Sequence, residues 1–267
     1  MDDNSIRGCE LRNGIKKDTP VFKYIKLEYL TEILQTGKMK LFHTAKWEKD
    51  GDVYENFLLK HSYEDTFGGK SCMLSLKNWK KYFYGQSWTT KDVSDAMWRI
   101  YSGTSKSDVK NCCKLCDIAV KIRTTVAKLC GVINGSLELD PSVITSSEAY
   151  IGNVIYMSDR KINKWVKEHS NLNGESITDS FFIKRSPFRH ENEVRIIVNN
   201  CDMVPVKKSI VLNVDECLFD EYVLDPRLNN CQSKAIKNQL VTIGVAENKI
   251  KKSILYTFEP KIIKVRY

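Results

Sequence analysis

The sequence of 267 residues lacks the patterns that mark a membrane or a secreted protein. It has no run of about 18 apolar residues, so it offers no candidate for a membrane-spanning helix. The start, MDDNSIRG, is polar and acidic, and no apolar stretch of the kind found in secretory signals follows it. We therefore expect a soluble protein of the cytoplasm.

The motifs of several well-known enzyme classes are also missing. The 13 glycines form no glycine-rich phosphate loop, no serine lies in a nucleophile elbow, and no segment repeats. The nine cysteines are an odd number without a secretory segment, which indicates reduced thiols. Cys113 and Cys116 have the spacing of half a zinc site, with Cys112 adjacent, but no second close pair follows. We expect no disulfide framework and no bound zinc.

What the chain does contain is the composition of a globular protein with a basic balance. Hydrophobic residues make up 42% and charged residues 28%, which argues against long disordered regions. The 42 basic residues outnumber the 33 acidic ones and give a formal net charge of +9. This excess favours, without requiring, an anionic partner such as a dinucleotide or a nucleic acid.

The apolar patterns predict strands and helices interspersed without a regular β-α-β cadence. This is typical of an α+β fold with mixed, mostly antiparallel sheets and peripheral helices. We expect a flexible N-terminal arm over residues 1–19 and a single domain over 20–267, with an insertion near 102–117. Residues 250–258 and 262–267 are predicted to close the chain as strands.

The densest cluster of ionisable groups between apolar runs is FFIKRSPFRHENEVRIIV, residues 181–198. If this stretch is extended after Pro187, one face carries charge and the other is mostly apolar. The charged face would hold Glu191, Glu193, Arg195 and Ile197, and the other face Asn192, Val194, Ile196 and Val198. Cations precede the strand at Lys184, Arg185, Arg189 and His190.

Two interpretations of this charged row are open. The two glutamates could line a functional cleft, in which carboxylates and a guanidinium act together. Alternatively, the row is a solvated sheet face with cross-strand ion pairs, each worth about 0.2 to 1 kcal/mol.

Two further segments concentrate chemically useful side chains. The segment around Asp52, Tyr54 and Glu55 enters a predicted helix, whose N-terminus favours carboxylates for electrostatic reasons alone, so a structural role is also open there. The stretch NWKKYFYGQSW, residues 78–88, alternates aromatics with lysines. It is either a stacking platform for bases or a loop whose aromatics pack on the core.

Several short motifs, taken in order over residues 21–258, resemble a widespread bacterial family of unknown function. The motifs are Lys23-Tyr24, Asp52-Val53-Tyr54-Glu55, Met97-Trp98 with Tyr101, DIAVKIRTTVAKL, YIGNVIYM, Lys184-Arg185, Glu191-x-Glu193-x-Arg195 and IKKSIL. The chain departs from that family at Val53, where the family usually has proline, and in the cysteine-bearing segment after Tyr101.

The layout is also similar to that of the ADP-ribosyltransferase superfamily. The shared points are an opening strand with a polar residue, a helix that ends in glycine, a strand that carries serine, and a late strand with the essential glutamate. This resemblance implies an ADP-ribosyltransferase-like fold and an enzyme that consumes NAD. Such an enzyme would act as a toxin or phage-defence effector on a nucleic acid or a protein.

The resemblance also implies roles for individual residues. Cleavage of the bond between nicotinamide and ribose leaves an oxocarbenium-like sugar, which a carboxylate stabilises. Glu193 or Glu191 would do this, and Ser75 would stand where the superfamily often has a strand serine or threonine. The remaining cofactor-binding residues would be aromatics that stack on nicotinamide, Tyr24, Trp98 and Tyr101, and cations that bind the pyrophosphate, Lys23, Lys184, Arg189 and Arg195.

Two other functions compete with this one. In a magnesium-dependent nuclease, Asp52 and Glu55 would join Glu191 and Glu193 around the metal, with Lys184 near the scissile phosphate. Arg195 follows Glu193 where many nucleases have lysine, which weakens this hypothesis. The third candidate is a non-catalytic nucleic-acid-binding module that uses the aromatic stretch 78–88.

Overall fold

The computed structural model describes most of the chain, with gaps. The described residues are 8–47, 52–67, 70–103, 115–139, 147–169, 174–200, 208–261 and 263. Most of the expected insertion near 102–117 lies outside them, as do Cys112, Cys113 and all but residue 263 of the strand expected at 262–267. No helix within these ranges is long and apolar enough to cross a membrane.

The described part of the chain forms an α+β fold with mixed, mostly antiparallel sheets, as the sequence predicts. The chain divides into two compact units. Unit 1 comprises Met1–Lys23, Thr36–Asp92 and Thr124–Leu218, and unit 2 comprises Tyr24–Gln35, Val93–Arg123 and Phe219–Tyr267. Each unit is described in turn.

Unit 1 contains most of the strands. Its strands are β1 (Glu10–Arg12), β2 (Pro20–Lys26, which ends in unit 2), β3 (Lys38–His43), β4 (Ser62–Phe67), β5 (Lys70–Ser75), β6 (Phe83–Thr89), β8 (Ser147–Asn153), β9 (Ile155–Met157), β10 (Ile183–Arg185), β11 (Glu193–Asn200) and β12 (Ser209–Asn213). Its helices are α3 (Phe57–Lys60), α5 (Val126–Leu139), α6 (Asp159–Glu168), α7 (Gly174–Ser180) and the 3-10 helices η1 (Thr44–Lys46), η2 (Trp79–Tyr82) and η5 (Ser186–Glu191).

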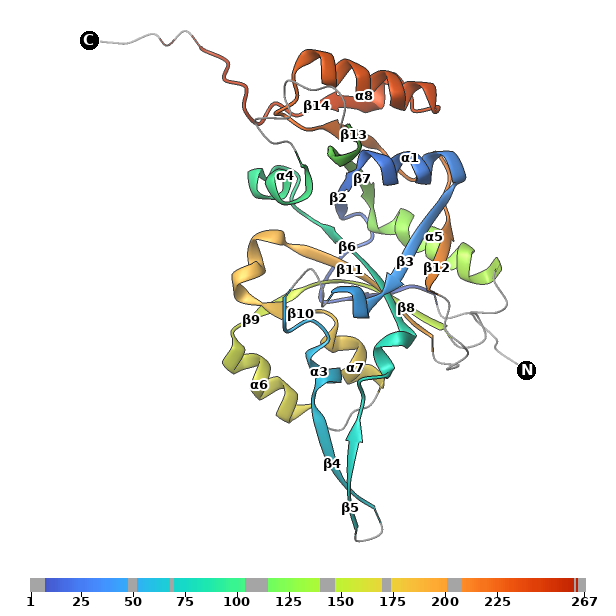
Figure 1. The fold of residues 1–267 in the computed structure, drawn as a ribbon, viewed down its shortest axis with the longest axis vertical. Coiled ribbons are helices and arrows are strands. Elements are labelled where there is room, and N and C mark those ends of the chain that lie inside the picture. Colours follow the sequence, from blue (N-terminus) through green and yellow to red (C-terminus); the bar gives the residue numbers. More distant parts are fainter. Residues whose placement is uncertain are drawn as a thin grey trace. The chain divides into compact units, whose positions relative to one another are not determined.

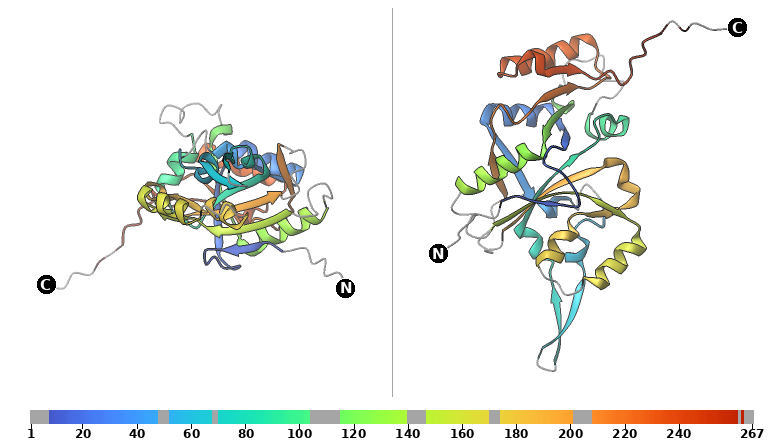
Figure 2. Two further views of the ribbon diagram at one scale, coloured as in Figure 1. Left: turned by 90° about the horizontal axis from the view of Figure 1, so that it is seen from below. Right: turned by 180° about the vertical axis from the view of Figure 1, so that it is seen from behind.

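Strand β11 lies inside the main sheet of unit 1. The strand order there is β1-β8-β11-β6-β2, and β3 pairs with both β6 and β12. Residues 193–198 of β11 are buried on both faces, so of the two interpretations of the charged row, the solvated sheet face does not hold for Glu193 and Arg195. The reason is that the sheet is covered on both sides. Helix α5 packs on β8 and β12 (Figures 1 and 2), and an apolar cluster forms around Phe83, Phe181 and Ile197.

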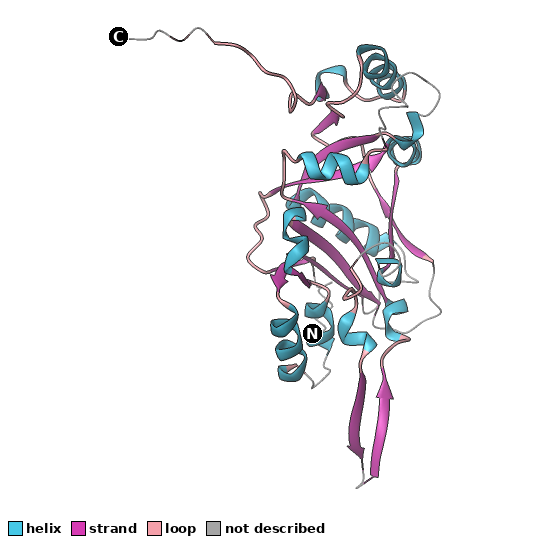
Figure 3. Cartoon of the chain, turned by 60° about the vertical axis from the view of Figure 1, so that its left-hand side comes forward, coloured by secondary structure: helices cyan, strands magenta, loops and turns pink. Residues whose placement is uncertain are grey.

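The start of the chain also takes part in this sheet. Residues 10–12, expected within a flexible arm, form β1 and pair in parallel with β8. Ile15 is buried. By contrast, β4 and β5 form a separate two-stranded sheet that projects from the rest of unit 1 (Figures 1 and 3).

Two strands expected from the sequence are interrupted for identifiable reasons. The strand expected over 150–157 is split at Val154 into β8 and β9. The N–H of Val154 still donates to the carbonyl of Glu193, but β9 pairs with β10.

The extended stretch expected from Pro187 begins with the 3-10 helix η5, because proline is well suited to a helix start. Asn192, in the left-handed region with φ 43°, then turns the chain into β11.

The aromatic stretch 78–88 packs inward. Trp79 and Tyr82 lie against the apolar cluster of unit 1, and Trp88 is buried. The aromatic rings thus pack on the core, as in one of the two interpretations, but from η2 and β6 instead of from a loop. The structure does not show a row of exposed rings on which bases could stack.

Unit 2 contains three paired strands in the order β7-β13-β14. Its elements are α1 (Leu27–Thr36), α4 (Asp95–Tyr101), η4 (Leu115–Asp117), β7 (Ala119–Thr125), β13 (Glu221–Leu224), α8 (Asn230–Thr242), η6 (Glu247–Lys249) and β14 (Ile250–Lys252). The strand expected over 250–258 stops at Lys252. Its partner β13 stops opposite it at Leu224, since Asp225 and Pro226 follow there.

Candidate active site

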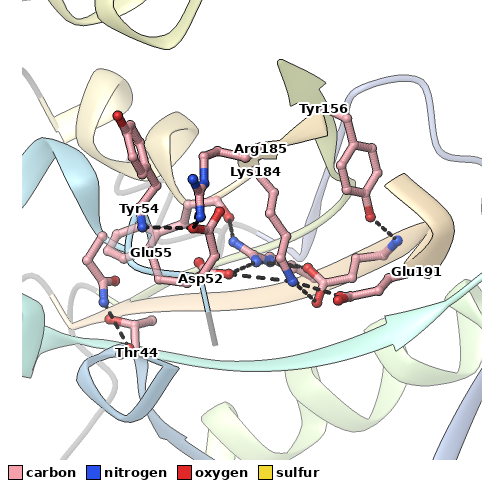
Figure 4. Close-up of polar contacts among 12 residues, drawn as sticks. Thr44, Asp52, Tyr54, Glu55, Tyr156, Lys184, Arg185 and Glu191 are labelled. Carbon is pink, nitrogen blue, oxygen red and sulfur yellow. Dashed lines mark hydrogen bonds and ion pairs between the residues drawn. The ribbon is translucent and has the colours of Figure 1, made fainter. Parts of the chain in front are cut away.

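Two parts of the chain that are far apart in the sequence bring their charged side chains together in unit 1. One is the turn 52–56, and the other runs from β10 through the end of η5 into the start of β11. Figure 4 shows the contacts among them. One ionic network therefore joins five residues of the motifs that the sequence singled out: Glu55, Lys184, Glu191, Glu193 and Arg195.

The centre of the network is Arg195, which is 1% exposed. Its Nε donates to Glu193 Oε2 at 2.8 Å, and its Nη2 donates to Glu55 Oε1 at 2.6 Å. Its Nη1 donates to the carbonyl of Phe181 at 2.6 Å, and the indole ring of Trp47 lies 4.6 Å from its Cζ. Every side of this guanidinium is thus satisfied, as burial of a cation requires.

Lys184 is the second buried cation. Its Nζ contacts three carboxylates: Glu191 Oε2 at 2.7 Å, Glu193 Oε1 at 3.2 Å and Glu55 Oε1 at 3.7 Å. Two cations therefore face three carboxylates, and one negative charge is left over unless a proton is bound. Burial lowers the pKa of Lys184, but Glu193 and Glu191 together outweigh burial, so the net pKa of Lys184 is raised and it stays protonated.

Glu193 and Glu191 differ in how readily they bind a proton. Burial tends to raise the pKa of Glu193, but the Arg195 guanidinium and the Lys184 ammonium outweigh burial and lower it to about 2. Burial and the charge of Glu193 raise the pKa of Glu191. A hydrogen bond between the two carboxyl groups acts in the same directions. Glu193 is therefore the permanently ionised member, and Glu191 is the one that takes up a proton more readily.

The backbone around the two glutamates is fixed by contacts that the sequence did not reveal. The N–H of Glu193 donates to the hydroxyl of Tyr156 at 2.8 Å, and the hydroxyl of Thr89 donates to the carbonyl of Glu191 at 2.6 Å. Because of the left-handed turn at Asn192, Glu191 lies outside strand β11. The carboxylates of Glu191 and Glu193 nevertheless both contact the Lys184 ammonium. Tyr156 lies in YIGNVIYM, but nothing in that apolar stretch distinguishes it.

A second ion pair lies beside the network. Arg185, the neighbour of Lys184 on β10, donates from Nε to Asp52 Oδ1 at 2.7 Å. The N–H of Tyr54 donates to the same oxygen, and the Tyr54 ring lies 4.7 Å from the Arg185 guanidinium carbon. The other oxygen of Asp52, Oδ2, is buried and has no hydrogen-bond partner within the described ranges.

Lys23 lies in unit 1 at the end of its part of β2. Its Nζ donates to the carbonyl of Ser87 at 2.7 Å and lies 5.6 Å from the ring centre of Trp88. Burial lowers the pKa of Lys23 to about 8, and the charge of Glu193 only partly opposes this. An amine of this kind is partly neutral near physiological pH.

The remaining residues expected at a site lie elsewhere or have other contacts. Ser75 is exposed at the end of β5, opposite Ser62 in the projecting hairpin, so the structure does not bring it beside Glu193 on the main sheet. Arg189 is exposed, and its Nη2 donates to the carbonyl of Tyr156 at 3.4 Å.

The three candidate stacking aromatics belong to unit 2. Tyr24 and Trp98 meet edge to face at 4.8 Å within a buried cluster, and Trp98 is 1% exposed. Trp98 therefore has no ring face left for a ligand. Tyr101 stacks on Tyr24 at 6.4 Å and is exposed.

The carboxylates that a nuclease would use are engaged by cations. Glu55, Glu191 and Glu193 each contact Lys184, and Asp52 is paired with Arg185. Within the described ranges, no group of three or more His, Cys, Asp or Glu residues is arranged to hold a metal ion.

Comparison with known proteins adds distant similarities only. No family model matches the chain, and no curated protein matches it. Three solved structures of Thermus sp. 2.9 DarT are similar at 12% identity. The complex with ADP-ribosylated ssDNA has a TM-score of 0.38 and covers 90% of this chain and 96% of its own. The NAD+ and carba-NAD+ complexes have TM-scores of 0.38 and 0.36, and both cover 89% of this chain and 96% of their own. Similarities at this level carry no argument, so the functional argument rests on the site.

Proposed function

We propose that this protein is an enzyme that breaks the bond between nicotinamide and ribose in NAD and transfers ADP-ribose to a nucleic acid or a protein. The observation that carries the proposal is the pair Glu191 and Glu193, which share the cation Lys184 but have pKa values shifted in opposite directions. Burial and the charge of Glu193 raise the pKa of Glu191, whereas Arg195 and Lys184 outweigh burial and lower the pKa of Glu193. Two neighbouring carboxyl groups with separated pKa values are the arrangement used to cleave glycosidic bonds.

Glu193 is suited to the step in which the glycosidic bond breaks. The bond electrons leave with the nicotinamide nitrogen, and positive charge develops on the ribose carbon and ring oxygen. A carboxylate that is held ionised by Arg195 and Lys184, and fixed through its backbone by Tyr156, can stabilise this charge without rearranging.

Glu191 is suited to the step in which the acceptor attacks. The acceptor oxygen or nitrogen forms the new bond to the ribose carbon, and its proton has to go to a base. A carboxylate with a raised pKa is a better base than one held at a low pKa, and Glu191 is the more exposed of the two, at 12% against 8%. Lys23 and the exposed Arg189 are the proposed cations for the pyrophosphate.

The test is to incubate the pure full-length chain with NAD and to measure released nicotinamide by chromatography and ADP-ribose on the acceptor by mass spectrometry. Single-stranded DNA, plasmid DNA, RNA and cell extract serve as acceptors, each with and without EDTA. The wild type should release nicotinamide in the presence of EDTA. Glu193→Gln, a nearly isosteric change, should lose about 10²- to 10³-fold in rate, and Glu191→Gln should lose less.

The matched control is Glu175→Gln. Glu175 is exposed and pairs with Arg12 at 3.3 Å, so this variant removes a glutamate ion pair outside the network and should keep the wild-type rate. If NAD stays intact with every acceptor while nucleic acid is degraded only with Mg²⁺, the protein is the nuclease. If it binds nucleic acid without any reaction, it is the binding module.

A further inference from the structure

Cys9 and Cys130 lie next to each other in unit 1, although they are far apart in the sequence. The N–H of Cys9 donates to Asn134 Oδ1 at 3.0 Å. Asn134 follows Cys130 by one turn of α5, so the two residues share a helix face. The two thiols lie close enough for each to shift the pKa of the other.

The residues after Cys9 hold it in this place. The carbonyl of Lys17 accepts from the N–H of Ala127 at 2.8 Å, and the carbonyl of Thr19 accepts from the N–H of Val126 at 3.1 Å. These bonds satisfy donors in the first turn of α5 that no helical carbonyl can reach. The segment from Cys9 to Thr19 is therefore fastened to α5 at both of its ends.

We propose that Cys9 and Cys130 are an oxidant-sensitive dithiol, and that their disulfide ties the N-terminal segment to α5. Cys9 is half-buried, so a small oxidant can reach the pair, and Cys130 is buried beside it. The other described cysteines whose side chains are placed, Cys72, Cys217 and Cys231, are exposed. They serve as internal controls.

The chemistry balances with a peroxide as the oxidant. Interaction with the Cys9 thiol lowers the pKa of the Cys130 thiol; burial opposes this, and the charge of Lys17 adds to it. The Cys130 thiolate attacks one peroxide oxygen, so an S–O bond forms, the O–O bond breaks, and the leaving hydroxide takes up a proton. The Cys9 sulfur then attacks the sulfenic sulfur and the S–O bond breaks. The second hydroxide takes the Cys9 proton and leaves as water.

The disulfide would stabilise β1, the short strand at the edge of the main sheet. β1 is three residues long and pairs only with β8 among the described strands. Its Arg12 is opposite Gly152, and Gly152 is in turn opposite Arg195 of β11. Oxidation would therefore restrain β1, whose Arg12 lies in register, across Gly152, with Arg195 of the ionic network.

The experiment treats the reduced full-length protein with stoichiometric hydrogen peroxide and maps its peptides by mass spectrometry. We expect a Cys9–Cys130 crosslink that has lost two hydrogen atoms. We also expect slower amide exchange over residues 10–12 and a thermal midpoint raised by roughly 5 to 10 °C, all reversed by dithiothreitol. Cys9→Ser and Cys130→Ala should each abolish the midpoint shift, and Cys72→Ser with Cys217→Ser should retain it.

Two results would overturn the proposal. One is a map in which peroxide leaves Cys9 and Cys130 as thiols while Cys72, Cys217 or Cys231 is oxidised. The other is a midpoint shift that survives in Cys9→Ser. Because Cys130 is buried, its variant can lose stability for packing reasons, and the half-buried Cys9→Ser therefore provides the decisive comparison.

Discussion

The ring of Trp47 fills the space that a side chain on Gly85 would need. A Cβ placed on Gly85 lies 2.7 Å from the Trp47 ring carbon Cζ2 and 2.8 Å from the carbonyl oxygen of Ile196. The same ring lies against the guanidinium of Arg195. The absence of a side chain at position 85 thus lets an aromatic ring cover the buried cation at the centre of the ionic network.

Gly85→Ala should therefore destabilise the protein. Neither a packed indole nor the backbone of β11 can move away easily, so we expect the free energy of unfolding to fall by about 1 to 3 kcal/mol in urea denaturation. Gly135→Ala in α5 is the control: a Cβ there would meet no atom within 4 Å apart from its chain neighbours and the backbone of its own helix. A helical Gly→Ala change should stabilise the protein by roughly 0.5 to 1 kcal/mol. Equal stability of Gly85→Ala and the wild type would mean that the Trp47 ring is free to move.

Glu193 should contribute stability that acid removes. Its pKa in the folded state is about 2, below the value of about 4.3 in an unfolded chain, so its contribution is present above about pH 4.3 and is lost as the pH falls toward 2. Glu193→Gln should cost roughly 3 kcal/mol at pH 7, because it leaves Arg195 partly unpaired. Urea denaturation at pH 7 and at pH 3 should show a smaller cost at pH 3. An equal cost at both pH values would contradict the low pKa.

Glu191 should respond to pH in the opposite sense. Its pKa is raised in the folded state, so its contribution is fully present below the unfolded pKa and is lost as the pH rises through the folded pKa. Glutamine resembles the protonated acid. Glu191→Gln should therefore match the wild type in acid and be at least as stable at pH 7, as measured by the same denaturation series. A large loss at pH 7 would mean that the Lys184 contact needs an ionised Glu191.

Lys23 should make the protein more stable in mild alkali. Its folded pKa of about 8 lies below the unfolded value of about 10.4, so the folded state prefers the neutral amine. The free energy of unfolding should rise between about pH 8 and 10.4 by roughly 1 to 3 kcal/mol. Lys23→Met should abolish this rise. Lys26→Met should not, because Asp117 raises the pKa of Lys26. A rise that persists in Lys23→Met would assign it to another group.

Asn192 should tolerate glycine better than alanine. Its φ of 43° is costly for a residue with a Cβ, and asparagine bears that cost better than most. Asn192→Ala should lower the free energy of unfolding by about 1 kcal/mol, while Asn192→Gly should stay near the wild type. Thermal unfolding of both variants measures the difference. An alanine variant as stable as the glycine one would mean that the turn adopts another backbone conformation.

Several features of the molecule follow from local sequence. The apolar run from Val194 to Val198 has the composition of a strand, and β11 forms there because β-branched side chains fit a pleated, covered surface. Gly37, with φ 62°, ends α1 as expected, because only a residue without a Cβ adopts that conformation at little cost. Local propensity and periodicity were likewise sufficient to predict an α+β fold.

The tertiary structure decided whether the charges are solvated or buried. Glu193 and Arg195 alternate in the sequence in the same way whether their face is open or covered, and local pattern contains no information on what lies above a sheet. This face is covered by Glu55, which lies 140 residues from Arg195 in the sequence, and by Lys184 on the separate strand β10. Lys184 and Arg195 lower the pKa of Glu193 against burial, while burial and the charge of Glu193 raise the pKa of Glu191. The sequence by itself determined which ionisable groups and strands were present. Only the fold determined which charged side chains are buried and must form ion pairs with one another, because burial depends on contacts between residues far apart in the chain.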